Sequence, residues 1–390
     1  MSATLISKAF GSFMFYWLFC LIGQAAEFVK VDSLSFYQGK KRFYSAGVNC
    51  VLIKDGESKN DPKVYDVSSL GTDGWKSQIK ERFGQWGFNT IGSYSAKELE
   101  TDFYYTVSLH MGNYTKKGWH QLMDVFDPEY EKLMEVFALE RCAPRKNDTN
   151  LLGYFVSNEI QWFGDLPWGP HSNSLLKRYQ ALPESAPGRR AVDVFEKEAK
   201  RVGLPDHRWE DVWAGIVAEE YMRTCTHVIR KHDPNHLILG VRFAALPPDE
   251  VVRSVSLFSD VLSFNLYNND FSKLDHYYYI TGKPLMVTEF SWRAKENRTG
   301  NLNRFGPWVD VQTQEDRANN YRKYLDKIMA RPYVIGIQWF QYFDQPAFGR
   351  NDGEDSNFGL VDINDKPYEE LTEQASQSNA RWHQLLRERE

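Results

Sequence analysis

The stretch LLGYFVSNE (151–159) combines the pattern of a buried strand with two polar residues at its carboxyl end. Its apolar residues follow one another without alternation, which predicts a strand covered on both faces, as in a parallel sheet. Asn158 and Glu159 come directly after this run. Because an amide and a carboxylate are costly to bury alone, we expect them to have a hydrogen-bonding partner or a chemical task.

Seven further apolar runs alternate with segments of helical periodicity. In chain order, the eight predicted strands are 45–50, 88–95, 103–111, 151–159, 236–244, 260–268, 283–290 and 334–342. Between them apolar residues recur three or four positions apart, which indicates helices packed against a sheet; the first such series is Trp75, Ile79, Phe83 and Trp86. The helix expected between the second and third strands is short. Eight alternations favour an α/β fold of the (β/α)8 TIM-barrel type over an open doubly wound sheet.

The predicted connections are of two unlike kinds. Helix-to-strand connections are tight, whereas several strand-to-helix loops are long: 51–73, 112–126, 160–209, 291–314 and 343–366. In such a barrel every strand-to-helix loop lies at the carboxyl face, where active sites are found. We therefore expect a single catalytic domain over 27–390, with a deep cleft at that face and a loop insertion at 160–209. Residues before Ser45 are expected to form a short hairpin that closes the opposite end.

The composition limits the kinds of partner. The 390 residues carry a formal net charge of −5 and no basic block, so neither nucleic acid nor an anionic membrane is expected to bind. The chain has 12 Trp, 21 Tyr and 25 Phe, which a large core would mostly absorb. Sugar-binding clefts also use exposed aromatic faces, so this content is compatible with a polysaccharide partner.

The first residues resemble a targeting segment. Lys8 precedes the apolar run FMFYWLFCLIG (13–23), which is too short to span a membrane and is followed by small residues. This pattern predicts a signal peptide over 1–26 and a secreted or periplasmic protein; an uncleaved anchor is the alternative. Three cysteines would remain after cleavage, Cys50, Cys142 and Cys225, and we expect buried free thiols rather than a disulfide framework.

A second glutamate, Glu289, lies at the end of the seventh predicted strand, KPLMVTEF (283–290). Its strand and that of Glu159 direct their carboxyl ends into the same barrel mouth. Two facing carboxylates suit glycoside hydrolysis, in which one protonates the leaving oxygen and the other, roughly 5 Å away, attacks the anomeric carbon. Burial and a neighbouring carboxylate would keep the donor protonated near neutral pH. A salt bridge or a helix cap is the alternative role of either residue alone.

An Asn-Glu pair after strand four and a Glu after strand seven resemble the clan A retaining glycoside hydrolases. The resemblance implies that Glu159 is the acid/base, that Glu289 is the nucleophile, and that Asn158 binds the 2-hydroxyl of the sugar. It also implies that Tyr267 lies near the nucleophile. Trp339, at strand eight, would form the floor of the subsite at the cleaved bond, unless it is a core residue.

The run WFQYFDQPAFGRNDGEDSNFGLVDINDKPYEEL (339–371) is similar to the β-agarase family, glycoside hydrolase family 50, and GYFVSNE (153–159) resembles that family's fourth strand. This resemblance implies that four residues bind substrate or order the loop: Gln341, Asp344, Arg350 and Glu354. An ion pair of Arg350 with Asp352 or Glu354 would serve only to hold the loop. TEFSWRA (288–294) departs from the family's usual His-containing continuation, and the long N-terminal accessory domain of many agarases is missing, which leaves specificity for agarose open.

Other strand ends and loops supply further candidates. His110, Arg242 and Asn49 end strands three, five and one, where they would bind hydroxyls or pack. Stacking on a sugar ring competes with simple packing for four loop tryptophans: Trp162, Trp168, Trp292 and Trp308. We find no metal-ligand spacing, glycine-rich phosphate loop or GxSxG elbow, so no cofactor is expected and hydrolysis would rest on the carboxylates.

The sequence therefore predicts a retaining glycoside hydrolase that cleaves β-glycosidic bonds in a polysaccharide or its oligosaccharides. The agarase resemblance makes agarose-type β-1,4-galactosidic linkages the expected substrate. The alternatives are a clan A enzyme acting on a β-galactoside, β-mannan or β-glucan, a barrel that binds polysaccharide without cleaving it, and a lyase. Endo or exo action and the oligomeric state stay open.

Overall fold

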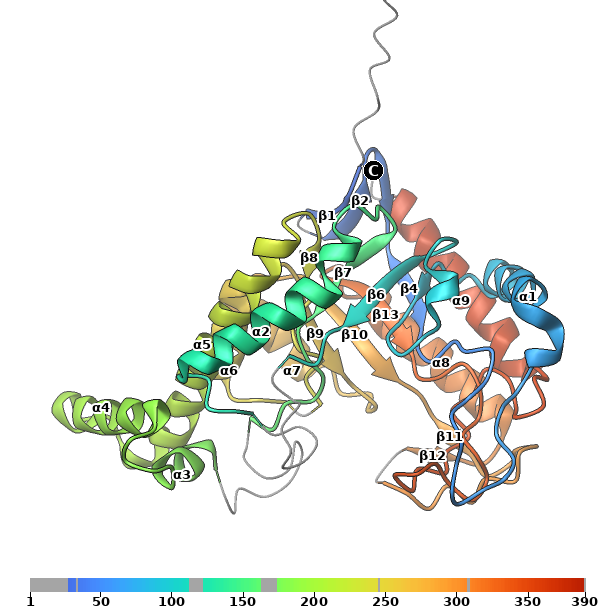
Figure 1. Ribbon diagram of the computed structural model, residues 1–390. Coiled ribbons are helices and arrows are strands. Elements are labelled where there is room, and N and C mark those ends of the chain that lie inside the picture. Colours follow the sequence, from blue (N-terminus) through green and yellow to red (C-terminus); the bar gives the residue numbers. More distant parts are fainter. Residues whose placement is uncertain are drawn as a thin grey trace, which may run out of the picture.

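The computed structural model describes residues 27–32, 34–111, 122–162, 174–244, 246–306 and 309–388. Its centre is an eight-stranded sheet in which all neighbouring strands run parallel (Figure 1). In spatial order the strands are β8 (Leu237–Ile238), β7 (Leu151–Phe155), β6 (Tyr104–Ser108), β5 (Thr90–Ile91), β4 (Ser45–Val48), β13 (Val334–Trp339), β10 (Leu285–Phe290) and β9 (Leu262–Asn265). Each of the eight predicted runs supplies one strand.

The sheet is curled, so that its end strands β8 and β9 approach each other. Phe243, just after β8, forms a parallel bridge with Phe264 of β9. The Phe243 N–H donates to the Ser263 carbonyl at 2.9 Å, and the Asn265 N–H donates to the Phe243 carbonyl at 2.8 Å. With helices on its outer face, this mostly parallel sheet is a TIM-like α/β fold, and the predicted α/β class is confirmed.

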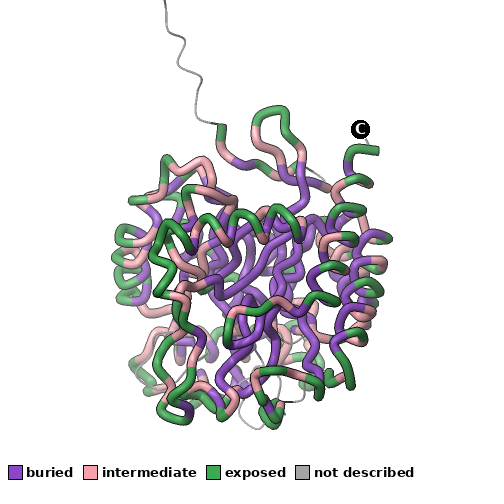
Figure 2. Tube along the Cα trace, turned by 90° about the vertical axis from the view of Figure 1, so that its right-hand side faces the viewer, coloured by how far each residue is buried: buried purple, intermediate pink, exposed green. Residues whose placement is uncertain are grey.

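Helices cover the outer face of the sheet, and their buried sides match the predicted periodicity. The buried strands lie in the interior in Figure 2, surrounded by helices whose outer edges are exposed. The surrounding helices are α1 (Gly71–Trp86), α2 (Pro128–Arg141), α5 (Trp209–His232), α6 (Asp249–Phe258), α7 (Ser272–Thr281), α8 (Gln314–Met329) and α9 (Glu369–Arg387). Helix α1 buries the four predicted residues Trp75, Ile79, Phe83 and Trp86. Between β5 and β6, where the sequence predicts a short helix, only the 3-10 turn Lys97–Leu99 is formed.

Two segments are more structured than the sequence predicts. The insertion at 160–209 contains helices α3 (Leu175–Gln180) and α4 (Pro187–Val202), which pack on each other and on α5 (Figure 1), so it is not a plain loop. Helix α4 is strongly amphipathic, and Val192, Phe195 and Ala199 are buried on its inner side.

The N-terminal residues form a three-stranded antiparallel sheet rather than a hairpin, with strands β1 (Val29–Asp32), β2 (Ser35–Gln38) and β3 (Lys41–Phe43). Gln38 connects this sheet to the amino ends of two barrel strands. Its Nε2 donates to the Thr149 carbonyl before β7 at 2.8 Å, and its Oε1 accepts from the Tyr104 hydroxyl in β6 at 2.7 Å. The small sheet therefore lies at the end opposite the carboxyl face, as predicted.

The three predicted free thiols, Cys50, Cys142 and Cys225, are all buried and unpaired with one another. Among the described residues, no helix is both long and apolar enough to cross a membrane. The predicted signal peptide at 1–26 and the candidates Trp168 and Trp308 lie outside the described residues.

Candidate active site

Glu159 and Glu289 lie at the carboxyl ends of their strands, as predicted. Glu289 is the second-last residue of β10, opposite Asn265 of β9, and only 6% of its surface is exposed. Glu159 follows β7, is half-buried, and donates its backbone N–H to the Arg242 carbonyl at 3.1 Å. Its φ of 53° lies in the left-handed region, which residues other than glycine rarely adopt. The chain therefore holds this carboxyl group in a specific direction.

Both carboxylate oxygens of Glu289 accept charge-assisted or strong hydrogen bonds. Arg242 Nη2 donates to Oε1 at 2.8 Å, and the Tyr267 hydroxyl donates to Oε2 at 2.7 Å. Burial raises the pKa of Glu289, while the Arg242 charge and the Tyr267 hydroxyl oppose that rise because they favour the anion. These contacts suit a carboxylate that is kept ionised and correctly oriented.

Glu159 has a different environment. Burial, followed by the negative charge of Glu289, raises the pKa of Glu159 to about 8, and a hydrogen bond from Asn265 opposes this only in part. Glu159 therefore favours its protonated form more than an exposed glutamate does. The two glutamates differ in their partners: a cation and a hydroxyl favour the anion of Glu289, whereas the Asn265 amide donates to Glu159.

Asn265 connects Glu159 to Thr288, the residue before Glu289, and sequence reasoning missed it. Its Nδ2 donates to Glu159 Oε1 at 2.8 Å and lies 3.4 Å from Asn158 Oδ1, while its Oδ1 accepts from the Thr288 hydroxyl at 2.8 Å. Asn158 is buried beside it. A signal was present, because Asn265 is a polar residue at the end of the sixth predicted strand, as Glu159 is at the end of the fourth.

The predicted residues Arg242 and Asn49 meet at the backbone of the strand that carries Glu289. Both are fully buried, and each donates to the Thr288 carbonyl, Arg242 Nη2 at 3.0 Å and Asn49 Nδ2 at 2.9 Å. Arg242 Nη1 also donates to the Tyr94 hydroxyl at 3.3 Å. The predicted His110 lies close by, with its ring centroid 5.6 Å from that of Tyr94. Arg242 therefore positions Glu289, and Tyr94 is a further site residue that the sequence did not reveal.

The predictions for Trp339 and Trp292 as sugar-stacking residues are wrong. Gln338 points to the inner face of the curled sheet, where its Nε2 donates to Thr106 Oγ1 at 3.0 Å, so Trp339 points outward. Trp339 is fully buried, with its ring 5.7 Å from that of Tyr321 in α8 and 6.0 Å from the equally buried Trp292. Neither ring can contact a sugar, because both fill the space between sheet and helix.

The next residue, Phe340, lies on the side of the site. It forms a small cluster with Cys50 and Phe358, against which the partly buried Tyr267 packs. The Phe340 and Phe358 ring centroids are 5.8 Å apart, and Tyr267 lies 6.1 Å from Phe358. The apolar wall beside Glu289 is therefore built by Phe340 and Phe358. Phe340 is the residue that follows the predicted Trp339.

The loop after β13 is held together by its own polar residues. Asp344 is fully buried and accepts hydrogen bonds from Thr299, Tyr368 and the Gly359 N–H, although burial raises its pKa to about 6. Gln341 is also buried, and its Nε2 donates to the Phe343 carbonyl at 2.9 Å. Both are therefore loop-ordering residues.

Arg350 and Glu354 occupy the same loop nearer the two glutamates. Arg350 forms ion pairs with Asp352 and Glu354, each at 2.7 Å, and Glu354 also accepts from Gln345 at 2.7 Å. The positive charge of Arg350 favours the anion of Glu289 and so opposes the rise in its pKa caused by burial. The negative charge of Glu354 adds to the rise in the pKa of Glu159. Within the described residues no group of His, Cys, Asp and Glu side chains could hold a metal ion.

No protein-family model matches the chain. Two curated relatives from Vibrio sp. (strain JT0107) do: β-agarase B is 27% identical over 350 residues, and β-agarase A is 25% identical over 370 residues. The alignments cover 78% and 79% of this chain but 36% of each relative. The chain thus spans about a third of the length of the curated relatives it matches.

Solved structures share the fold. The agarase AgWH50C superposes with a TM-score of 0.74 at 21% identity, covering 93% of this chain and 64% of that one. BpGH50 superposes with a TM-score of 0.76, also at 21% identity, covering 93% and 83%. An exo-β-agarase superposes with a TM-score of 0.73 at 19% identity, covering 92% and 66%. The predicted resemblance is confirmed: the chain is β-agarase-like, similar in sequence to curated β-agarases and in fold to agarases of glycoside hydrolase family 50.

Proposed function

We propose that this protein is a retaining glycoside hydrolase that cleaves β-1,4-galactosidic bonds of agarose or its oligosaccharides. The observation that carries the proposal is the unequal pair of glutamates: Arg242 and Tyr267 both donate to the Glu289 carboxyl group, while burial raises the pKa of Glu159 to about 8. Such a pair supplies a nucleophile and a proton donor at the same pH. The sequence similarity to β-agarases A and B supports agarose as the substrate.

In the first step, a carboxylate oxygen of Glu289 attacks the anomeric carbon while the bond to the leaving oxygen breaks. Glu159 donates its proton to that oxygen, and a covalent glycosyl ester forms on Glu289. Arg242 keeps the attacking carboxylate oriented, since it binds both that carboxylate and the neighbouring Thr288 carbonyl.

In the second step, Glu159, now an anion, takes a proton from water. The water oxygen attacks the anomeric carbon and releases Glu289 as a carboxylate, so that the sugar keeps its configuration. The Asn265 amide donates to Glu159 and favours its anionic form at this stage. We further propose that the curled sheet closes into a (β/α)8 barrel at the Phe243–Phe264 bridge, and that the enzyme acts outside the cytoplasm, as its apolar N-terminal segment suggests.

The decisive experiment compares the native protein with Glu289→Gln and Glu81→Gln on agarose, following released reducing ends and product size. Glu81 is exposed on α1 and serves as the matched control. We expect fragments of the neoagaro type from the native and control proteins and none from Glu289→Gln. If the native protein releases no product from agarose but cleaves another β-linked glycan, the proposed substrate is wrong and the proposed mechanism stands. Tight glycan binding without any product would identify a binding barrel instead.

A further inference from the structure

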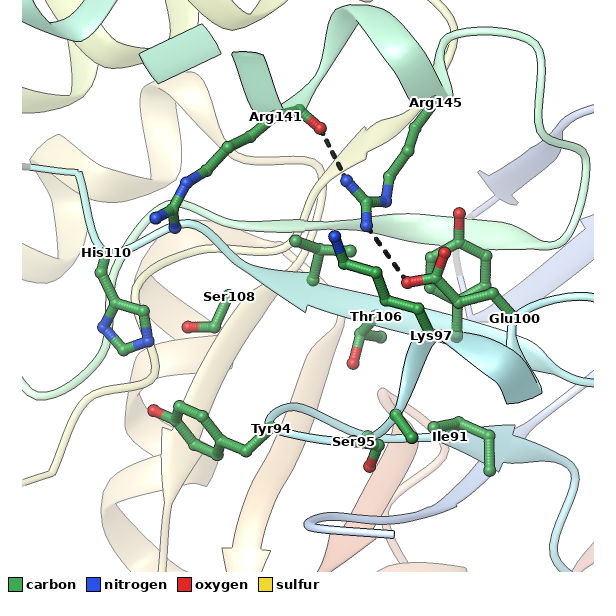
Figure 3. Close-up of a pocket in the computed structure, with 14 residues that line it drawn as sticks. Ile91, Tyr94, Ser95, Lys97, Glu100, Thr106, Ser108, His110, Arg141 and Arg145 are labelled. Atoms are coloured by element: carbon green, nitrogen blue, oxygen red, sulfur yellow. Dashed lines mark hydrogen bonds and ion pairs between the residues drawn. The ribbon is translucent and has the colours of Figure 1, made fainter. Parts of the chain in front are cut away.

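The described part of the chain contains a cavity of about 580 Å³ beside strand β6, lined by the segment after β5 and by the end of α2 (Figure 3). Tyr94 and His110 lie together at one end of it, while Glu100 and Arg145 lie at the other. Its volume is within the range of small-molecule sites. We call this cavity the lateral groove, and the role inferred for it rests on the proposed glycosidase function.

The lateral groove exists because two elements of a regular barrel are shortened here. Strand β5 pairs with β6 only at Thr90–Tyr104 and Ile91–Tyr105. The chain after Ile91 then turns toward β4, where Ser93 accepts from the Cys50 N–H at 3.0 Å, while β6 continues to Ser108 along β7. Only the 3-10 turn Lys97–Leu99 follows β5, so within the described residues no α-helix covers this stretch, and β6 is visible between α1 and α2 in Figure 1.

One wall of the groove is linked to Glu289 by hydrogen bonds through Arg242. Tyr94, on its wall, accepts a hydrogen bond from Arg242 Nη1 at 3.3 Å, and the other terminal nitrogen of Arg242 binds Glu289 at 2.8 Å. A sugar unit next to the one being cleaved could therefore extend past Tyr94 and His110 into the groove, where Ser108 Oγ is a buried polar atom with no hydrogen-bond partner among the described residues.

The charged side chains of the groove favour an anion. Three cationic residues, Lys97, Arg141 and Arg145, line it together with the single carboxylate Glu100. Arg145 is paired with Glu100 at 3.2 Å. Lys97 and Arg141 form no ion pair with any described residue; Arg141 donates from Nη1 to the Leu109 carbonyl at 3.1 Å and keeps its other donors for a ligand. Two positive charges in the groove are thus not compensated.

We propose that the lateral groove is a subsite for a sugar unit that carries an anionic group, either a sulfate ester or a carboxylate. Arg141 and Lys97 would bind the anionic group, since a guanidinium binds planar and tetrahedral oxyanions with paired donors. Tyr94 and His110 would contact the sugar ring at the end of the groove nearest the glutamates. The substrate would accordingly be a galactan that is acidic at some of its units.

Binding of three monosaccharides to the native full-length chain tests this: galactose 6-sulfate, galacturonic acid and neutral galactose, each by titration calorimetry at low and high ionic strength. We expect at least one acidic sugar to bind roughly tenfold or more tightly than galactose, the scale of one charge-assisted hydrogen bond. Salt should weaken that preference. Tighter binding of the sulfate ester would identify a sulfated glycan, and tighter binding of the carboxylate a uronic acid.

Variants locate the effect. Lys97→Gln, at an exposed position, and Arg141→Gln should each remove most of the preference without changing galactose binding. Arg141→Lys should retain part of it, and Lys146→Gln, an exposed lysine outside the groove lining, should retain all of it. Equal binding of acidic and neutral sugars would overturn the inference, as would a preference that survives the Lys97→Gln/Arg141→Gln double variant. Inorganic sulfate binding as tightly as the sugar would also overturn it. Agarose cleavage is measured separately, so failure of the proposed activity and failure of the subsite are distinguishable.

Discussion

Replacing Tyr267 by Phe removes one hydroxyl and nothing else from the environment of Glu289. That hydroxyl donates to Glu289 Oε2 at 2.7 Å and favours the ionised carboxylate. A hydrogen bond to a charged group contributes about 1.5–3 kcal/mol. Since 1.36 kcal/mol corresponds to one pKa unit, the pKa of Glu289 should rise by about one to two units in the Tyr267→Phe variant.

The pH dependence of kcat/KM measures this shift. The proposed reaction requires Glu289 ionised and Glu159 protonated, so on this mechanism the acid limb reports the first group and the alkaline limb the second. In Tyr267→Phe the acid limb should move to higher pH by about one to two units, whereas the alkaline limb, set by Glu159, should move much less.

A matched control is Tyr65→Phe, which removes a hydroxyl that donates to a different carboxylate, Asp365 Oδ1, at 2.9 Å. It should leave both limbs in place, because Asp365 takes no part in the proposed reaction. An acid limb that does not move in Tyr267→Phe, or that moves equally in Tyr65→Phe, would refute the assignment of Glu289 as the ionised nucleophile held by Tyr267.

Three further changes test the rest of the site and the core. Glu159→Gln should lower kcat/KM on polysaccharide by roughly 10²–10⁴-fold. With an aryl glycoside whose leaving group needs no proton, the rate of glycosyl ester formation should fall much less, which burst kinetics would measure. Trp339→Phe should leave KM unchanged but lower the free energy of unfolding in urea by about 1–3 kcal/mol, because the Phe358 carbonyl loses its donor at 2.9 Å; a raised KM would return Trp339 to the subsite. Asp233→Asn should lower the free energy of unfolding by about 1–3 kcal/mol, because the buried Asp233 carboxylate loses its hydrogen bonds with His236 at 2.7 Å and with Tyr154 at 2.6 Å. The hydrogen bonds from His236 and Tyr154 hold the pKa of Asp233 below its ordinary value against burial, so the native stability from this group is present above that ordinary value and is lost as pH falls through the folded pKa. The variant should therefore lose less stability than the native protein on acidification.

Much of the architecture could be predicted from local patterns. Eight apolar runs predicted eight strands, and the apolar spacing in 75–86 predicted the buried side of α1. The two glutamates were also predictable, because a carboxylate that follows a buried strand needs a partner, and parallel strands bring such residues to one end of the barrel. The short helix predicted between β5 and β6 is replaced by a 3-10 turn, at the place where the helical pattern is weakest.

The direction of each side chain was decided by the tertiary structure. Successive residues of a strand point to opposite faces, so an error of one position exchanges a core residue for a site residue. Trp339 faces α8 and Phe340 faces the site for this reason. Helices α3 and α4, which form where a loop was predicted, likewise depend on packing against α5.

The sequence by itself determined the eight strands of the large sheet, the periodic helices that cover it and the positions of the two acidic residues, since these depend on periodicity and burial within short segments. Only the tertiary structure decided which groups surround each glutamate. Asn265 of β9 donates to Glu159, which follows β7, and Arg242, which follows β8, donates to Glu289 of β10, so each contact passes over one intervening strand. Burial raises the pKa of both glutamates, and these contacts oppose that rise. The lateral groove likewise depends on where β5 leaves β6. Charges and hydrogen bonds act over a few ångströms in space, whereas these residues are separated by many positions in the chain.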